Sequence, residues 1–143
     1  KVKMKKIYAG MAADIIHHGH INLIKKARSF GYLIIGILSD EAVKSYKREP
    51  IYNFMQRKMI FENIKGVDKV VKQNTLSYKK NLMRYKPNYV IHGDDWKKGV
   101  QTNIRQEVID CLNIWGGKLI EIKYTKNIST TSIINRILNN NPK

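Results

Sequence analysis

The sequence predicts an α/β fold in which a parallel five-stranded sheet carries helices on both faces. Short apolar runs alternate along the chain with segments whose apolar residues recur at helical spacing. Strands that alternate with helices of roughly ten residues are typical of a covered parallel sheet. The length of 143 residues fits one domain, and residues 5–138 contain no internal repeat or linker. We therefore expect a single domain over residues 1–143, of which 139–143 form a loose polar tail or the start of a linker.

The first two strands are indicated by uninterrupted apolar runs. KKIYAGM at 5–11 is the first, and YLIIGIL at 32–38 is the second. Between them, residues 21–30 place apolar side chains on one helical face and basic side chains on the other. Gly31 is expected to close that helix.

The rest of the chain repeats this alternation of strands and helices. Ser39, Ser77 and Ser129 stand ahead of helical segments as candidate N-caps, and Pro87 stops the helix before it. The further elements that we expect are helices at 39–46, 53–64, 78–85, 103–115 and 129–138, and strands at 67–71, 88–92 and 118–124.

Three of the four histidines lie in the turn between the first strand and the first helix. His17, His18 and His20 surround Gly19. Free N–H groups at a helix N-terminus attract phosphate, and a glycine there lets the backbone approach a ligand. In open parallel sheets, ligands bind beyond the carboxyl ends of the strands, which is where the cluster falls. The cluster therefore favours phosphate binding, with His17 and His20 as the acting residues and His18 as a neighbour.

Two other interpretations of the histidines stay open. A metal site needs three or four ligands, but His92 follows a different strand and Cys111 is expected inside a helix. Ordinary capping of a helix explains one or two of the histidines, but not three of them together with a glycine.

The composition restricts the class of protein. The formal net charge is +16, but the lysines are scattered and no RNP-like or zinc-finger spacing appears. We attribute the charge to compositional bias and an affinity for polyphosphates, and keep a basic nucleic-acid-binding module only as the alternative from a different class. The apolar runs fall far short of the ~20 residues of a membrane helix. No signal peptide is evident, and a single cysteine fits a reducing cytoplasm.

Three motifs in order carry a resemblance to a known family. H-x-G-H at 17–20 follows the first strand, GDDW at 93–96 follows the fourth, and ISTT ends the segment YTKNISTT at 124–131. The segment QRK at 56–58 adds to this resemblance. The chain resembles the nucleotidylyltransferases that include the glycerol-3-phosphate, choline-phosphate and ethanolamine-phosphate cytidylyltransferases. It looks most similar to the domains found with phosphoenolpyruvate mutase in phosphonate pathways, and the resemblance implies a Rossmann-like nucleotidylyltransferase fold.

The resemblance also implies roles for individual residues. It makes His17, His20 and Lys47 catalytic, with Lys47 bridging the phosphates of the nucleotide and the acceptor. It makes Lys47, Asp95 and Trp96 part of the acceptor pocket. The nucleotide-binding residues that it implies are Met11, Ala12, Ala13, Asp14, Gly19, Arg57, Gly93, Asp94, Tyr124, Thr125, Ile128, Ser129, Thr130 and Thr131.

The chain departs from the family pattern in three places. The usual G-[TV]-[FY]-D is Met-Ala-Ala-Asp at 11–14, so the aromatic residue is lost. Tyr124 replaces the usual Arg, and Lys126 or Arg57 is expected to supply its charge. The loop KQNTLSY at 72–78 has no Trp for a quaternary ammonium group, which disfavours a choline substrate.

The implied activity is transfer of CMP from CTP to a small phosphonate or phosphate, with release of pyrophosphate. Of the acceptors, 2-hydroxyethylphosphonate and aminoethylphosphonate are favoured, and glycerol 3-phosphate is the alternative. Mg²⁺ is expected with CTP, held by phosphate oxygens and water. The resemblance further implies a homodimer and a fused or neighbouring phosphoenolpyruvate mutase domain.

Overall fold

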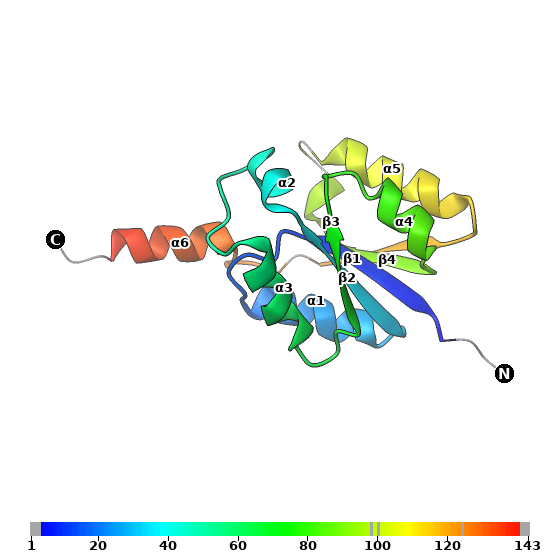
Figure 1. The fold of residues 1–143 in the computed structure, drawn as a ribbon, viewed down its shortest axis with the longest axis horizontal. Helices are drawn as coiled ribbons and strands as arrows, with labels where there is room; N and C mark the ends of the chain where they lie inside the picture. The colour runs from blue at the N-terminus through cyan, green and yellow to red at the C-terminus, as the bar shows by residue number, and fades with distance from the viewer. Residues whose placement is uncertain (1–3, 98, 100, 124, 141–143) are drawn as a thin grey trace.

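Five parallel strands form one sheet in the order β3-β2-β1-β4-β5 (Figure 1). The computed structural model describes residues 4–97, 99, 101–123 and 125–140. The strands are β1 (Lys6–Met11), β2 (Tyr32–Leu38), β3 (Lys69–Gln73), β4 (Tyr89–Gly93) and β5 (Lys118–Ile122). The strand order reverses at β1, because β2 and β3 extend to one side of it and β4 and β5 to the other. The predicted fold class is confirmed.

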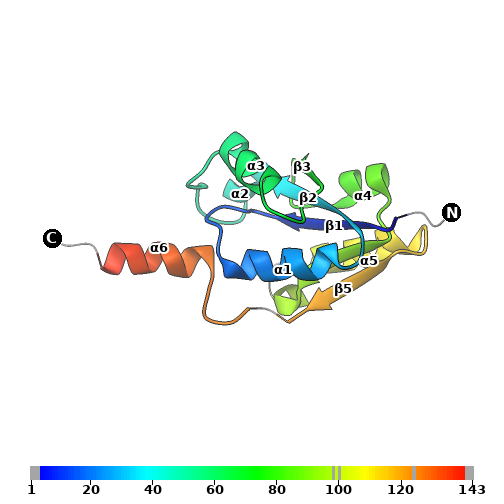
Figure 2. The same cartoon turned by 90° about the horizontal axis from the view of Figure 1, so that it is seen from below.

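Helices cover both faces of this sheet. Helices α1 and α3 pack on one face and α4 and α5 on the other, whereas α6 points away from the sheet (Figures 1 and 2). The helices are α1 (His18–Arg28), α2 (Asp40–Lys44), α3 (Phe54–Glu62), α4 (Lys79–Tyr85), α5 (Thr102–Asn113) and α6 (Thr130–Asn139), with a 3₁₀ turn η1 (Asp94–Lys97) after β4. Among the described helices, none is long and apolar enough to cross a bilayer.

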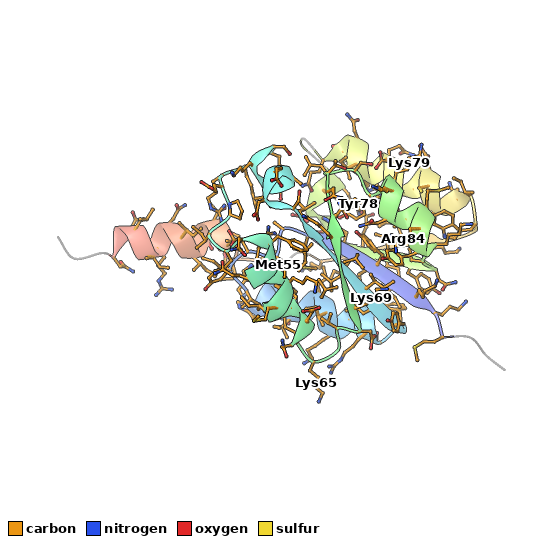
Figure 3. The ribbon with its side chains drawn as sticks, in the orientation of Figure 1. Met55, Lys65, Lys69, Tyr78, Lys79 and Arg84 are labelled. Atoms are coloured by element: carbon orange, nitrogen blue, oxygen red, sulfur yellow. The ribbon has the colours of Figure 1, made fainter. Side chains whose placement is uncertain are left out.

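The core has two apolar layers, one on each face of the sheet. Ile7 and Ile35 pack toward α1 and α3, whereas Tyr8 and Ile34 pack toward α4 and α5. The central strands are therefore continuous apolar runs rather than alternating ones, since both faces are buried. Figure 3 shows Tyr78, just before α4, lying toward the sheet, which agrees with its burial in the second layer.

Several element boundaries differ from those predicted by one to three residues, and two of the differences have a clear physical cause. Helix α1 begins at His18, three residues before the expected start, because His17 caps it with its own side chain. Strand β3 starts at Lys69 rather than at residue 67. The Asp68 carboxylate accepts the Leu33 N–H at 2.8 Å, so this residue belongs to the turn that leads into the strand.

Strands β1 and β4 separate before they end. In the described chain their ladder joins Ile7 to Tyr89 and Tyr8 to Val90 and goes no further, although β1 continues to Met11 and β4 to Gly93. Over the same residues β1 stays paired with β2. The separation occurs where the strand order reverses, which is where open α/β sheets bind ligands.

Candidate functional site

A cavity of about 290 Å³ occupies the carboxyl end of the sheet where β1 and β4 separate. Four segments far apart in the sequence form its walls: the β1–α1 turn, the segment after α2, the end of β4 with η1, and the residues that lead into α6. The predicted site residues that line it are Met11, Ala12, Ala13, Asp14, His17, Gly19, His20, Lys47, Gly93, Asp95, Trp96, Thr125, Ile128, Ser129, Thr130 and Thr131. Arg57 and Asp94 are not among the lining residues, and Tyr124 lies outside the described residues.

The two imidazoles of the H-x-G-H motif are held in one tautomer by the helix that they cap. His17 Nδ1 accepts the Gly19 N–H at 3.0 Å, and His20 Nδ1 accepts the His17 N–H at 3.1 Å. Because Nδ1 is an acceptor in each neutral ring, the proton sits on Nε2. The ring centroids lie 4.1 Å apart. The capping box thus makes both Nε2–H groups donors at the N-terminus of α1, beside the cavity.

Burial keeps both imidazoles neutral. Desolvation, followed by the neighbouring His17 and Lys47, lowers the pKa of His20 to about 4. The pKa of His17 is also lowered, chiefly by burial and then by His18. The His20 ring packs edge-on against Phe61, with centroids 5.7 Å apart, which accounts for its poor solvation. Two neutral donors at a helix N-terminus suit an anionic ligand.

The depressed pKa of His20 predicts a dependence of stability on pH. The unfolded chain binds a proton near the ordinary histidine pKa of 6.5, whereas the folded chain does so only near 4, so the free energy of unfolding falls as pH drops through this window. The loss attributable to His20 should be about 2–3 kcal/mol. Denaturant unfolding at pH 7, 5.5 and 4 measures it.

Two variants test the origin of this pH dependence. His20→Asn should flatten the decline between pH 6.5 and 4, whereas His18→Asn, at an exposed position in the same turn of α1, should not. Equal slopes for His20→Asn and the parent chain would assign the decline to other groups.

Lys47 brings a cation to the cavity from the segment after α2. Its Nζ lies 5.4 Å from the centroid of the Tyr46 ring, and its pKa is lowered by burial and then by Arg48. A half-buried ammonium next to two neutral imidazole donors makes this wall of the cavity a donor surface. The predicted position of Lys47 in the site therefore agrees with the structure.

Arg48 was not singled out from the sequence, although it follows Lys47 directly. Its Nη1 donates to Thr131 Oγ1 at 3.5 Å, and its Nη2 lies 3.6 Å from Asp14 Oδ2. Its Nε and Nη2 are buried with no hydrogen-bond partner in the described part of the chain. Arg48 is not among the residues that line the cavity, but its guanidinium contacts the lining residue Thr131 at the start of α6, and its Nε–H is a donor without a protein partner among the described residues. No periodicity marks this property, because it depends on partners that are distant in sequence.

Asp14 and Arg57 are engaged within the protein. The Asp14 carboxylate is 2% exposed and accepts the N–H groups of Ile51 and Tyr52 at 2.9 and 3.0 Å. The Arg57 side chain is 0% exposed and donates to the carbonyl oxygens of Ala12, Leu38 and Tyr52 and to the Asp40 carboxylate. The structure does not bring Arg57 to the cavity, so it does not supply the charge missing at position 124. Both side chains fix the loops around the cavity.

The end of β4 forms the opposite wall. His92 lies 18% exposed in the cavity lining, and its ring stacks on Trp96 with centroids 3.6 Å apart and planes 4° apart. Trp96 Nε1 donates to Glu121 at 2.8 Å, and Arg105 donates twice to the same carboxylate at 2.9 Å. Trp96 is thus both a core residue and a wall of the cavity.

The residues before α6 close the cavity from a third side. Ser129 caps the helix by accepting the Ser132 N–H at 3.0 Å, as predicted. Thr130 Oγ1 donates to the Ile15 carbonyl at 3.0 Å, which ties this segment to the β1–α1 turn. The N–H groups of Ser129 and Ser132 are used within the capping box, so the N–H groups of Thr130 and Thr131 are the main-chain donors that the start of the helix can offer to a ligand.

Within the described residues, no group of three His, Cys, Asp or Glu side chains is placed to hold a metal ion. The ionisable groups nearest to the histidines of the motif are cations or already bonded carboxylates. A metal at this site would therefore rely on ligand oxygens.

Comparisons with known proteins find a matching family and relatives. Residues 8–136 match the model of the cytidylyltransferase-like family. The chain is 28% identical to an ethanolamine-phosphate cytidylyltransferase of Arabidopsis thaliana, with 96% of this chain and 33% of that protein covered. It is 30% identical to a glycerol-3-phosphate cytidylyltransferase of Staphylococcus aureus, with 91% and 92% covered. The chain thus spans about a third of the length of the ethanolamine-phosphate enzyme.

A solved structure shows the same fold. The lipopolysaccharide core biosynthesis protein of Thermoplasma volcanium superposes with a TM-score of 0.74 at 23% identity, over 87% of this chain and 100% of that one. The Arabidopsis and Staphylococcus enzymes are both named for phosphate esters, and they give no support to the expected link with phosphonate pathways.

Proposed function

Because this chain belongs to the cytidylyltransferase-like family, we propose that it transfers CMP from CTP to the phosphate group of a small phospho-alcohol. An oxygen of the acceptor phosphate attacks the α-phosphorus of CTP. The bond from that phosphorus to the oxygen bridging to the β-phosphate breaks, and pyrophosphate leaves with the electron pair. The acceptor oxygen is already anionic near neutral pH, so no strong general base is required.

The observation that carries this proposal is the pair of fixed Nε2–H donors on His17 and His20. Charge on the phosphoryl oxygens and on the leaving oxygen shifts during in-line displacement. Donors that are already oriented stabilise this charge without reorganising. Neutral imidazoles fit the task, because they donate hydrogen bonds without first having to gain a proton.

Cations complete the phosphate site. Lys47 bears a flexible point charge that can reach the phosphates of both substrates. We assign Arg48 to the triphosphate, although it does not itself line the cavity, because it contacts the lining residue Thr131 at the start of α6 and its buried Nε lacks a hydrogen-bond partner among the described residues. With the N–H groups of that helix, these residues offset the charge that two polyanions bring together.

Mg²⁺ is expected to enter with CTP. Triphosphate oxygens and water would supply most of its ligands, as is usual for this ion, which fits the lack of a three-residue metal-binding group among the described residues. Its chemistry there would be to neutralise charge on the leaving pyrophosphate. The protein's own part is to position both phosphate chains.

The acceptor is proposed to be a phospho-alcohol such as ethanolamine phosphate or glycerol 3-phosphate. Relatives named for these two substrates match most of the chain. This supports the alternative that the sequence left open rather than a phosphonate.

Release of pyrophosphate tests the proposed function. Purified protein with Mg²⁺ should release pyrophosphate from CTP, and much less from ATP, when ethanolamine phosphate or glycerol 3-phosphate is added. The phosphonates are included as further acceptors. Absence of release from CTP with every acceptor would overturn the proposal.

A further inference from the structure

His92 is a polar residue of the cavity that the phosphate chemistry does not use. It lies at the carboxyl end of β4, across the diverging strands from the β1–α1 turn. Its ring belongs to the cavity lining together with Asp95 and Trp96. The H-x-G-H motif and the cations account for the phosphates. The family resemblance implies that Asp95 and Trp96 of this wall contact the acceptor, but it assigns no ligand to His92.

The hydrogen bonding of His92 decides which of its ring nitrogens can accept a hydrogen bond. Its Nδ1 lies 2.8 Å from the Gly93 carbonyl oxygen. Because a carbonyl oxygen only accepts, Nδ1 carries the proton and Nε2 presents a lone pair. Burial lowers the pKa of His92, so the ring is neutral at pH 7. This tautomer is the reverse of that of His17 and His20, whose Nε2 atoms carry the proton.

The ring is also held rigidly. It stacks flat on Trp96 at 3.6 Å, and the indole is anchored by its hydrogen bond to Glu121. The Arg105 fork holds that carboxylate through two bonds of 2.9 Å. An acceptor atom that is fixed by stacking and by a chain of charged hydrogen bonds is organised before a ligand arrives.

The two walls of the cavity therefore have opposite hydrogen-bonding character. The wall with His17, His20 and Lys47 offers donors, as phosphate oxygens require. The β4 wall offers the His92 lone pair and the Asp95 carboxylate, whose Oδ1 lies 3.9 Å from His92 Nδ1. A ligand that satisfies both walls has phosphate at one end and a hydrogen-bond donor at the other.

We propose that His92 Nε2 accepts a hydrogen bond from the hydroxyl or primary ammonium group of the acceptor, and so selects phospho-alcohols with a donor group two or three bonds from the phosphate ester carbon. This inference rests on the proposed function. A quaternary ammonium group has no N–H to offer, and a plain alkyl phosphate leaves the lone pair unpaired. Both should be poor acceptors, because a site built for a hydrogen bond rejects an analogue that lacks it.

Substrate selectivity of ring variants tests the inference. The measured quantity is the kcat/KM for ethanolamine phosphate divided by that for ethyl phosphate, at saturating CTP. His92→Phe keeps a flat ring on Trp96 but removes the acceptor, and should lower this ratio about 10- to 100-fold. His92→Gln keeps an acceptor atom and should retain most of the ratio. His18→Phe, the same change at an exposed position of α1, should leave it unchanged.

Further acceptors separate the two kinds of donor group. Comparing the kcat/KM values for glycerol 3-phosphate and ethanolamine phosphate shows whether the site prefers a hydroxyl or an ammonium group. Phosphocholine carries a positive charge but no N–H, so its kcat/KM shows whether charge alone is enough. Thermal melting verifies that each variant folds.

The outcomes separate the two proposals. An unchanged ratio in folded His92→Phe overturns the inference, and so does a rise in the KM for CTP with every acceptor, which would place His92 on the nucleotide. In both cases CTP-dependent release by the parent chain would leave the proposed function standing. Failure of the parent chain to release pyrophosphate overturns both.

Discussion

Replacement of His20 by asparagine is expected to lower kcat by about 10²- to 10³-fold, which is the usual effect of removing one transition-state donor. The Asn side chain can still accept the His17 N–H, as His20 Nδ1 does at 3.1 Å, so the helix cap is kept. What is lost is the donor at Nε2. His17→Asn should behave alike, because it can still cap Gly19. The measurement is pyrophosphate release at saturating CTP and acceptor.

A second substitution makes this test specific. In His20→Gln the amide nitrogen lies near the position of the imidazole Nε2, so a donor is partly restored, and kcat should recover relative to His20→Asn. His18→Asn serves as the matched control, since His18 is exposed in the same turn of α1. Near-parent kcat in both His17→Asn and His20→Asn would remove the two imidazoles from the chemistry.

Arg57→Met is expected to lower the free energy of unfolding by about 3–5 kcal/mol. The side chain is 0% exposed and is the donor to three carbonyl oxygens, at 2.6, 2.7 and 2.9 Å. Methionine fills similar space but satisfies none of them, and it leaves the Asp40 carboxylate without its 2.6 Å partner. Buried acceptors that lose their donor incur the full cost of desolvation.

The neighbouring residue of α3 supplies the control. Lys58→Met removes the 2.8 Å pair with Glu62, whose side chain is 44% exposed, and should cost less than about 1 kcal/mol. Urea unfolding of both variants gives the comparison. Equal losses of unfolding free energy in the two variants would mean that the buried contacts of Arg57 do not stabilise the fold.

The fold was predictable because its signals are local. Apolar runs at 5–11 and 32–38 and helical spacing at 21–30 each follow from neighbouring residues, and the order of strands and helices then restricts the topology. Boundaries were less predictable where side chains competed for backbone groups. The start of α1 depends on the cap that His17 provides, and the start of β3 depends on the bond from Leu33 to Asp68.

The site was predictable where motif residues face the cavity and less so where burial decides their role. Arg57 stands in a motif-like position, but its guanidinium is engaged by three carbonyl oxygens and the Asp40 carboxylate rather than by the cavity. Conversely, His92 lines the cavity and stacks on Trp96, whereas Arg48 lies next to the lining residue Thr131 with a buried Nε that has no hydrogen-bond partner among the described residues. The position of His92 at a strand end was the one sequence signal that could have indicated it.

The early separation of β1 from β4 gives part of the site a tolerance to mutation. Beyond Tyr8 and Val90 the two strands no longer pair, and main-chain groups of both border the cavity with the side chains. Peptide groups present the same donors and acceptors whatever residue carries them. A ligand edge that binds to peptide groups would survive changes at Met11 and Ala12, where this chain departs from its family. Ala13 is different, because it is 2% exposed and its φ is 60°. Recognition by the backbone would let the side chains at those two positions vary, whereas the two imidazoles of the same β1–α1 segment could not.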